Sequence, residues 1–257
     1  MAWANYMVDK ERDKMQQNIL EIKDFSKIYT GGKKAVDGLN LTVAPGDIFG
    51  FIGHNGAGKT TTIRAIVGVM DFETGSIVVD GQHDVKTDSV AAKSKIAYIP
   101  DKPDVYEYIT GIQYLNYMAD IFGVDKDLRK QRIEKYAAAF EMTTSLGDLI
   151  SSYSHGMKQK ISLIAAFLHQ PKLLILDEPF IGLDPIAAIR LKEMMAELCA
   201  LGSAIFFSSH VLVMVEKLCN KIAIIKGGRL VTVGETEAVL GDSSLEEIFV
   251  EVSQINE

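Results

Sequence analysis

The residues most able to do chemistry lie in a glycine-rich segment that follows a short apolar stretch. Residues Ile48–Ile52 are expected to form a buried strand. The strand leads into the spacing G-x-x-x-x-G-K-[ST], whose fixed positions are Gly53, Gly58, Lys59 and Thr60. Glycines let backbone N–H groups turn inward around an anion, and a helix beginning near Gly58 adds the positive end of its dipole. Lys59 supplies a mobile charge for phosphates and Thr60 a hydroxyl for Mg²⁺, so the segment predicts a nucleoside triphosphate site.

Two adjacent carboxylates follow the most continuous apolar run of the chain. Residues 173–176 are typical of a central parallel strand buried on both faces, and Asp177 and Glu178 come directly after them. Such a pair is costly at the end of a buried strand unless a cation accompanies it. Downstream of a phosphate loop, this arrangement favours Asp177 as a Mg²⁺ ligand and Glu178 as the group that polarises an attacking water. A solvated charge pair is the alternative interpretation.

Three further polar or aromatic positions are candidates for contact with a nucleotide. His210 follows an apolar strand expected at residues 204–207, and the ends of parallel strands are where α/β folds bind ligands. The polar turn at 151–157 leads into a helix expected at 158–169, whose N-terminus is a second potential anion site. Tyr29 precedes the phosphate loop, where its ring could stack on a base, although packing is the commoner role of such an aromatic.

The remaining pattern indicates the elements that must position these residues. Alternation of apolar and polar residues predicts an edge strand at 19–25 and a strand at 36–43. Helical spacing predicts a helix at 59–69 and a helical insertion at 101–149, whose aromatic residues are assigned mostly to the core. Tyr106 and Tyr108 are expected in a loop, free to meet a partner. The chain should close with a hairpin at 222–233 and an amphipathic helix at 245–252.

Length, composition and charge restrict the class of protein. The 257 residues are 47% hydrophobic, which is sufficient for one large α/β domain with its own core. The net charge of -7 and the lack of a basic stretch argue against nucleic acid as a partner. No transmembrane helix or signal peptide is apparent, and residues 1–18 are expected to be a flexible extension. Cys199 and Cys219 lie in apolar helical patterns and are interpreted as reduced core residues of a cytosolic protein.

Taken together, the motifs resemble those of ATP-binding subunits of ABC transporters over roughly residues 19–251. The resemblance implies an α/β fold of the P-loop NTPase type, with a mixed sheet core, an antiparallel β subdomain and a helical subdomain. The ABC ATPase domain would span 19–257, with the helical subdomain inserted at about 101–168. It also implies ATP hydrolysis with Mg²⁺, with Glu178, His210 and Lys59 as catalytic residues.

The resemblance assigns further nucleotide contacts to the positions that match the family's motifs. Beside the fixed residues named above, the phosphate loop contributes His54, Asn55, Gly56, Ala57 and Thr61. Tyr29 matches the aromatic residue that stacks on adenine. Asp101 occupies the position of the family's glutamine loop; it is shorter than glutamine and cannot donate a hydrogen bond when ionised, but it could hold Mg²⁺. The signature segment reads YSHGM, which keeps Ser154 and Gly156 around His155 but lacks the usual first glycine and the glutamine.

The family pairs two such subunits head to tail around two ATP molecules. Ser154 and the backbone at Gly156 would then touch the γ-phosphate across the interface between the two copies. Glu178 would orient the attacking water, and His210 would contact the γ-phosphate. The variant signature and the closing SLEEIF resemble Ecs-type exporters with a separate multi-span membrane subunit, some of which export peptides. That permease would dock near residues 101–108 and hold the chain at the cytoplasmic face of the membrane.

Two alternatives compete with this transport motor. One is a soluble ABC ATPase of another class, such as a translation factor, a DNA-repair ATPase or an iron–sulfur assembly ATPase. The single phosphate loop, the short insertion and the two isolated cysteines fit those classes less well. The other is a regulatory switch that binds ATP and hardly hydrolyses it, which the changed glutamine-loop position keeps open.

Overall fold

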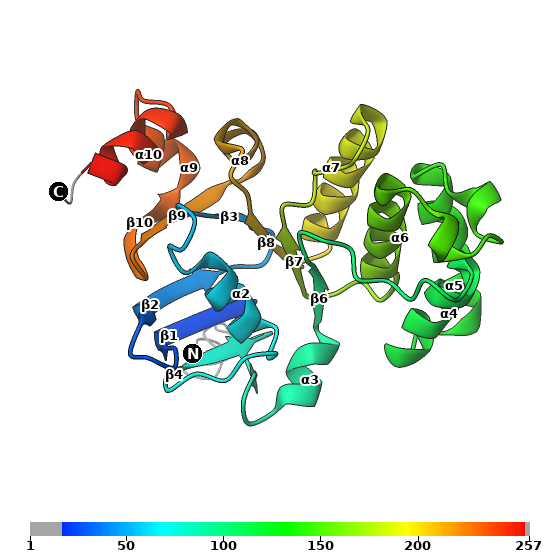
Figure 1. Ribbon diagram of the computed structural model, residues 1–257, viewed down its shortest axis with the longest axis horizontal. Helices are drawn as coiled ribbons and strands as arrows, with labels where there is room; N and C mark the ends of the chain where they lie inside the picture. Colours follow the sequence, from blue (N-terminus) through cyan, green and yellow to red (C-terminus); the bar gives the residue numbers. More distant parts are fainter. Residues whose placement is uncertain (1–16, 255–257) are drawn as a thin grey trace, which may run out of the picture.

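The computed structural model describes residues 17–254 and arranges them in two β-sheets flanked by helices (Figure 1). The first sheet is antiparallel, in the order β2-β1-β4-β5, and its strands are β1 (Leu20–Ile28), β2 (Lys34–Val43), β4 (Thr74–Val79) and β5 (His83–Asp84). The strand predicted at 19–25 is present as β1, but its predicted position at the edge of a sheet is wrong, because β1 pairs with β2 on one side and β4 on the other. The alternation of apolar and polar residues indicates which face of a strand is buried. It does not indicate whether another strand pairs with either of its edges.

The second sheet carries the strands that precede the predicted chemistry. Its order is β10-β9-β3-β8-β7-β6, and only β10 runs antiparallel to its neighbour. β7 lies between β6 and β8, is parallel to both and is buried, which confirms the buried parallel strand predicted at 173–176. The pairing of β9 with β10 confirms the hairpin. The strands are β3 (Ile48–Ile52), β6 (Ile96–Ile99), β7 (Leu173–Asp177), β8 (Ala204–Ser208), β9 (Lys221–Lys226) and β10 (Arg229–Glu235).

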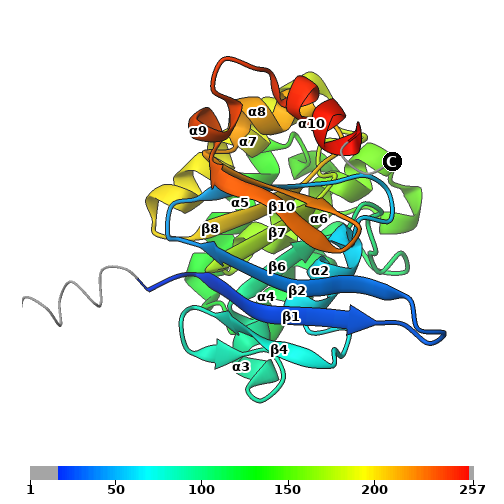
Figure 2. The same cartoon turned by 90° about the vertical axis from the view of Figure 1, so that its left-hand side faces the viewer.

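The strand before the phosphate loop is buried on both faces, which holds the loop in a fixed place. Phe49 and Phe51 of β3 point into the core shared with the antiparallel sheet, whereas Ile52 belongs to the core shared with the helices. A Cβ on Gly50 would lie 2.6 Å from Val215 Cγ1, so the helix behind the strand approaches its backbone directly. The two sheets meet where β2 lies beside β10, with Asp37 N–H donating to the carbonyl of Gly228 at 2.9 Å (Figure 2).

The helices surround the second sheet, and α4, α5 and α6 form a group beyond β6 (Figure 1). The helix predicted at 59–69 ends at Ile66, because Gly68 adopts a left-handed φ of 66°. The helices are α2 (Lys59–Ile66), α3 (Ser89–Ser94), α4 (Gly111–Ile121), α5 (Lys126–Ala139), α6 (His155–Leu168), α7 (Pro185–Ala200), α8 (Leu212–Leu218), α9 (Thr236–Leu240) and α10 (Leu245–Gln254), with short 3-10 turns at Thr143–Ser145 and Ile150–Ser152.

The inserted helices bury most of their aromatic residues, as predicted, but expose some. Tyr114 and Tyr136 are buried, whereas Tyr117 of α4 is 46% exposed. Tyr106 and Tyr108 lie in the preceding loop and are 57% and 94% exposed, which confirms that they are open to a partner. Both cysteines are free, Cys219 buried and Cys199 half-buried.

None of the helices in residues 17–254 has the length and apolarity needed to cross a bilayer. The predicted extension at 1–18 falls almost entirely outside the described residues.

Candidate functional site

One cleft of about 610 Å³ gathers most of the predicted site residues from distant parts of the sequence. It opens at the carboxyl ends of β3 and β7, the usual ligand-binding edge of an α/β sheet. Gly53, Ala57, Ser154 and Gly156 do not line this cleft. The residues that do are Tyr29, Lys33, Ala35, His54, Asn55, Gly56, Gly58, Lys59, Thr60, Thr61, Asp101, Lys102, His155, Asp177, Glu178, Ile181 and His210.

The phosphate loop is closely packed at Gly58 and curls around its own lysine. Gly58 has a φ of 113°, and a Cβ there would lie 2.7 Å from the carbonyl oxygen of Ala35, so only glycine fits. Lys59 Nζ donates to the carbonyl oxygens of Gly53 and His54. Burial lowers the pKa of Lys59, and this is opposed by the carboxylates of Glu178 and Asp177. The loop thus holds a half-buried cation at the point where phosphates would enter.

The Asp177 carboxylate lies at the end of β7, near two other carboxylates and one cation, Lys59. Its oxygen accepts a hydrogen bond from the Ser208 hydroxyl at the end of β8. Burial is the main cause that raises the pKa of Asp177, and the nearby carboxylates of Asp101 and Glu178 raise it further. A divalent cation would relieve this unfavourable placement. The Thr60 hydroxyl and the two aspartates supply the hard oxygen donors that Mg²⁺ prefers, so the residues present fit that ion.

Glu178 is fixed by three hydrogen bonds at the turn after β7. Its Oε1 accepts from the backbone N–H of His210 at 2.7 Å and lies 2.7 Å from His210 Nδ1, while Oε2 accepts from the Ser209 hydroxyl at 2.9 Å. Glu178 has a left-handed φ of 52°, a conformation that costs a non-glycine residue about 1–3 kcal/mol and is concentrated at functional sites. The turn therefore directs the carboxylate toward His210 instead of continuing the strand.

Tyr29 is tied to the helix that follows the phosphate loop. Its hydroxyl lies 3.2 Å from Thr61 Oγ1 and 3.4 Å from Met70 Sδ. The residue is 40% exposed and lines the cleft, so it is both anchored and accessible. This position suits a ring that stacks on a base.

The signature segment packs against the turn that follows Glu178. Ser154 caps α6 by accepting the N–H of Met157 at 3.3 Å, so the helix begins at His155 and the predicted start at Lys158 is wrong. A Cβ on Gly156 would lie 2.7 Å from the Gly182 carbonyl oxygen, which explains why a glycine occupies this position.

The sequence interpretation missed two residues that attach α6 to the site. Gln159 is 1% exposed, and its Nε2 donates to the carbonyl oxygen of Pro179 at 3.2 Å. Lys160 Nζ forms an ion pair with Asp184 Oδ2 at 2.6 Å. A glutamine on the face of a helix that is otherwise apolar was the available signal, since a buried amide needs a partner.

Comparisons with known proteins agree with this geometry. The family model described as ABC transporter matches residues 36–181. The chain is 35% identical over 242 residues to the ABC-type transporter ATP-binding protein EcsA of Bacillus subtilis (strain 168), covering 92% of this chain and 97% of that protein. It is 33% identical to the linearmycin resistance ATP-binding protein LnrL of the same organism, covering 93% of this chain and 76% of LnrL.

A solved structure of an ATP-binding subunit of an ABC transporter superposes with a TM-score of 0.88 at 34% identity, covering 92% of this chain and all of the other. The overall fold is thus shared with a solved ATP-binding subunit of an ABC transporter. The chain belongs to the ABC transporter family, as an ATP-binding subunit of the ATPase type that powers transport.

Proposed function

We propose that this chain is the motor of an exporter, and that it drives a separate transmembrane subunit by dimerising around two Mg²⁺-bound ATP molecules. The observation that carries the proposal is the Glu178–His210 pair, held by 2.7 Å contacts in the same cleft as the phosphate loop. A carboxylate so placed can orient a water and accept its proton as the water attacks the γ-phosphate. This arrangement favours hydrolysis over a switch that only binds nucleotide.

The cleft offers a contact for each part of Mg²⁺-ATP. Tyr29 would stack on the base, the loop N–H groups from His54 to Thr61 and Lys59 would hold the phosphates, and Thr60 with Asp177 would ligate Mg²⁺. Asp101 lines the same cleft and would hold the ion directly or through water. When bound, the ion would neutralise phosphate charge and so lower the barrier to attack. Among residues 17–254, no three acidic, histidine or cysteine side chains are grouped to hold a metal alone, so phosphate oxygens would complete its coordination.

The position of the signature segment supports a head-to-tail dimer. Ser154 and Gly156 stand outside the lining of their own chain's cleft, although Ser154 is exposed at the N-terminus of α6. A helix N-terminus attracts anions, and of residues 154–157 only His155 lines the cleft of its own chain. The N-terminus of α6 would therefore cover the γ-phosphate bound by a second copy.

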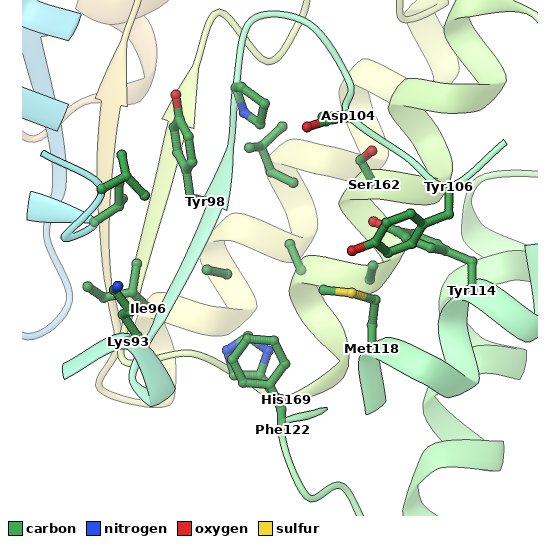
Figure 3. A pocket seen from close by; sticks show the side chains of 17 residues that line it. Lys93, Ile96, Tyr98, Asp104, Tyr106, Tyr114, Met118, Phe122, Ser162 and His169 are labelled. Carbon is green, nitrogen blue, oxygen red and sulfur yellow. The ribbon is translucent and has the colours of Figure 1, made fainter. Parts of the chain in front are cut away.

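A groove between β6 and the inserted helices supports docking of a membrane partner near residues 101–108. It has a volume of about 460 Å³ and lies between Tyr98 on one side and Tyr106, Tyr114 and Met118 on the other (Figure 3). Tyr106 is 57% exposed as a residue, and its ring packs edge-on against Tyr114, with ring centroids 6.1 Å apart. Exposed aromatic rings on a fixed support are typical of interface anchors. Such docking would place the chain at the cytoplasmic face of the membrane.

The relatives support export as the direction of transport. LnrL is named for resistance to linearmycin, and resistance through an ABC transporter is most simply achieved by removing the compound from the cell. We extend that direction to this chain. Peptides are the cargo class implied by the resemblance to Ecs-type exporters and their relatives, and the membrane subunit would select among them.

The experiment is to purify the chain from membranes in mild detergent, identify what accompanies it, and measure ATP hydrolysis with and without that partner. A multi-span protein that stimulates hydrolysis is the expected result. Lys59→Ala is the control, because loss of the loop cation should abolish ATP binding and partner-stimulated hydrolysis while leaving partner association intact. A soluble partner, or hydrolysis that no membrane protein changes, would contradict the transport motor.

A further inference from the structure

The C-terminal helix contacts the phosphate loop directly, although the two are far apart in the sequence. The His54 ring packs on the Phe249 ring, with centroids 4.2 Å apart and planes inclined by 40°. His54 Nε2 also hydrogen-bonds the Ser253 hydroxyl one turn further along α10. Because that hydroxyl donates its only proton to the Phe249 carbonyl, it accepts from His54, and Nε2 must carry the hydrogen.

The backbone of the same histidine organises the phosphate loop. Its carbonyl oxygen accepts the N–H of Ala57 at 3.0 Å and the ammonium of Lys59 at 3.2 Å. The side chain of His54 is thus held by α10, while its backbone holds the loop turn and the lysine that would meet the phosphates. A displacement of the side chain that also moved the His54 backbone would alter the position of both.

The helix α10 is itself fixed at each end. Lys226 Nζ, at the end of β9, donates to the carbonyl oxygens of Val252 and Ser253 at 2.9 and 2.8 Å, which satisfies the C-terminal end of the helix. At its start, the N–H of Leu245 donates to the Glu216 carboxylate at 3.0 Å on α8, the helix that follows His210 (Figure 1). The helix therefore spans from the histidine side of the site to the phosphate loop.

We propose that α10 is a brace for the phosphate loop: Phe249 and Ser253 are positioning residues that hold His54 and thereby raise the affinity for ATP. The proposal rests on the proposed use of the cleft for Mg²⁺-ATP. A loop whose shape is set before binding loses less conformational freedom when the nucleotide enters, so its affinity is higher. Neither residue touches the nucleotide site itself, because neither lines the cleft.

The test compares Ser253→Ala and Phe249→Ala with Val250→Ala in the full chain. Val250 lies on the same helix and is 54% exposed, so it is a matched control. Dissociation constants for a fluorescent ATP analogue with Mg²⁺ should rise about threefold for Ser253→Ala and about threefold to tenfold for Phe249→Ala, and stay unchanged for Val250→Ala. KM for ATP should rise in parallel, with kcat changed less than about twofold, because Glu178 and His210 are untouched.

A double-mutant cycle separates positioning from a general loss of stability. In a His54→Ala background, Ser253→Ala and Phe249→Ala should change the dissociation constant by less than about 1.5-fold, since their contact is already gone. The same weakening with and without His54 would overturn the proposal, and so would unchanged affinity in both single variants. Ser253→Ala, which removes one oxygen, keeps the test valid if Phe249→Ala unfolds. A wild-type chain that fails to bind ATP would instead contradict the proposed function.

Discussion

The substitution Glu178→Gln removes the negative charge of this side chain but keeps its size and shape. The amide oxygen of glutamine can still accept the N–H of His210, now 2.7 Å from Glu178 Oε1, and the Ser209 hydroxyl can turn to accept from the amide nitrogen. Only the charge assistance of these hydrogen bonds is lost, which is roughly 1 kcal/mol of stability. The chain should stay folded. Loss of a positioned general base, in contrast, costs about 10²–10⁴-fold in rate, or about 3–5 kcal/mol of barrier.

The assay is phosphate release by the purified chain at saturating Mg²⁺-ATP, together with ATP affinity and gel filtration. We expect hydrolysis to fall at least about 100-fold while the dissociation constant stays within about threefold, and ATP to trap a dimer. Glu193→Gln is the matched control, since Glu193 is a half-exposed glutamate whose one ion pair within residues 17–254 is with Arg190 on α7. Hydrolysis that remains within about tenfold of wild type would refute the role of Glu178. A chain that stays monomeric with ATP would refute the head-to-tail dimer.

Four other substitutions test separate features of the structure. Asp47→Ala removes a buried carboxylate that accepts three hydrogen bonds, and should lower the free energy of unfolding by about 2–4 kcal/mol in a denaturant titration. The Asp177→Asn variant should have a higher melting temperature than wild type at pH 7. The fold raises the pKa of Asp177, so the stability of the wild type falls as the pH rises from the ordinary value of 3.8 through the raised pKa. In melting curves recorded over a pH series, the difference between variant and wild type should therefore vanish at the acid end. Gly156→Ala should reduce phosphate release more than about tenfold, because its Cβ would meet the Gly182 carbonyl oxygen at 2.7 Å. Asp101→Gln restores the residue usual in the family and should preserve or raise hydrolysis; complete loss in the same assay would give the aspartate a role of its own.

The parts of the site that could be predicted are the residues that come directly after a recognisable buried strand. The fixed spacing after β3 and the carboxylates after β7 needed only the recognition of a buried strand and of what comes next. Parallel strands bring their carboxyl ends to one edge of the sheet, so residues far apart in the sequence converge on one cleft. His210 was placed at that edge by the same reasoning. Tyr29, which lies between β1 and β2 of the antiparallel sheet, was proposed from its position before the phosphate loop and from the family resemblance.

The parts that could not be predicted depend on contacts between segments with no local pattern. β1 was expected at an edge, but β4 pairs with its free side after an excursion through the phosphate loop. The contact of His54 with Ser253 joins residues 199 positions apart, and nothing in either neighbourhood indicates the other. The predicted start of α6 was too late because the sequence has both a serine that can cap a helix, Ser154, and a glycine two residues later that disfavours one. The hydrogen bond from the Met157 N–H to the Ser154 hydroxyl shows that the serine caps the helix.

Three consecutive residues of α6 connect the turn after β7 with the groove proposed for the membrane subunit. Gln159 holds the carbonyl of Pro179, next to Glu178, and Lys160 holds the turn that begins α7 through Asp184. Lys158 pairs with Glu107, in the loop that carries Tyr106 into the groove. A displacement of the turn after β7 during hydrolysis would therefore act on the groove through one helix. Because Gln159 is 1% exposed and its Oε1 finds no hydrogen-bond partner among the residues that the structure describes, this side chain would be costly to keep for packing alone. Its place between the turn and the groove gives a physical reason for a buried polar residue in α6.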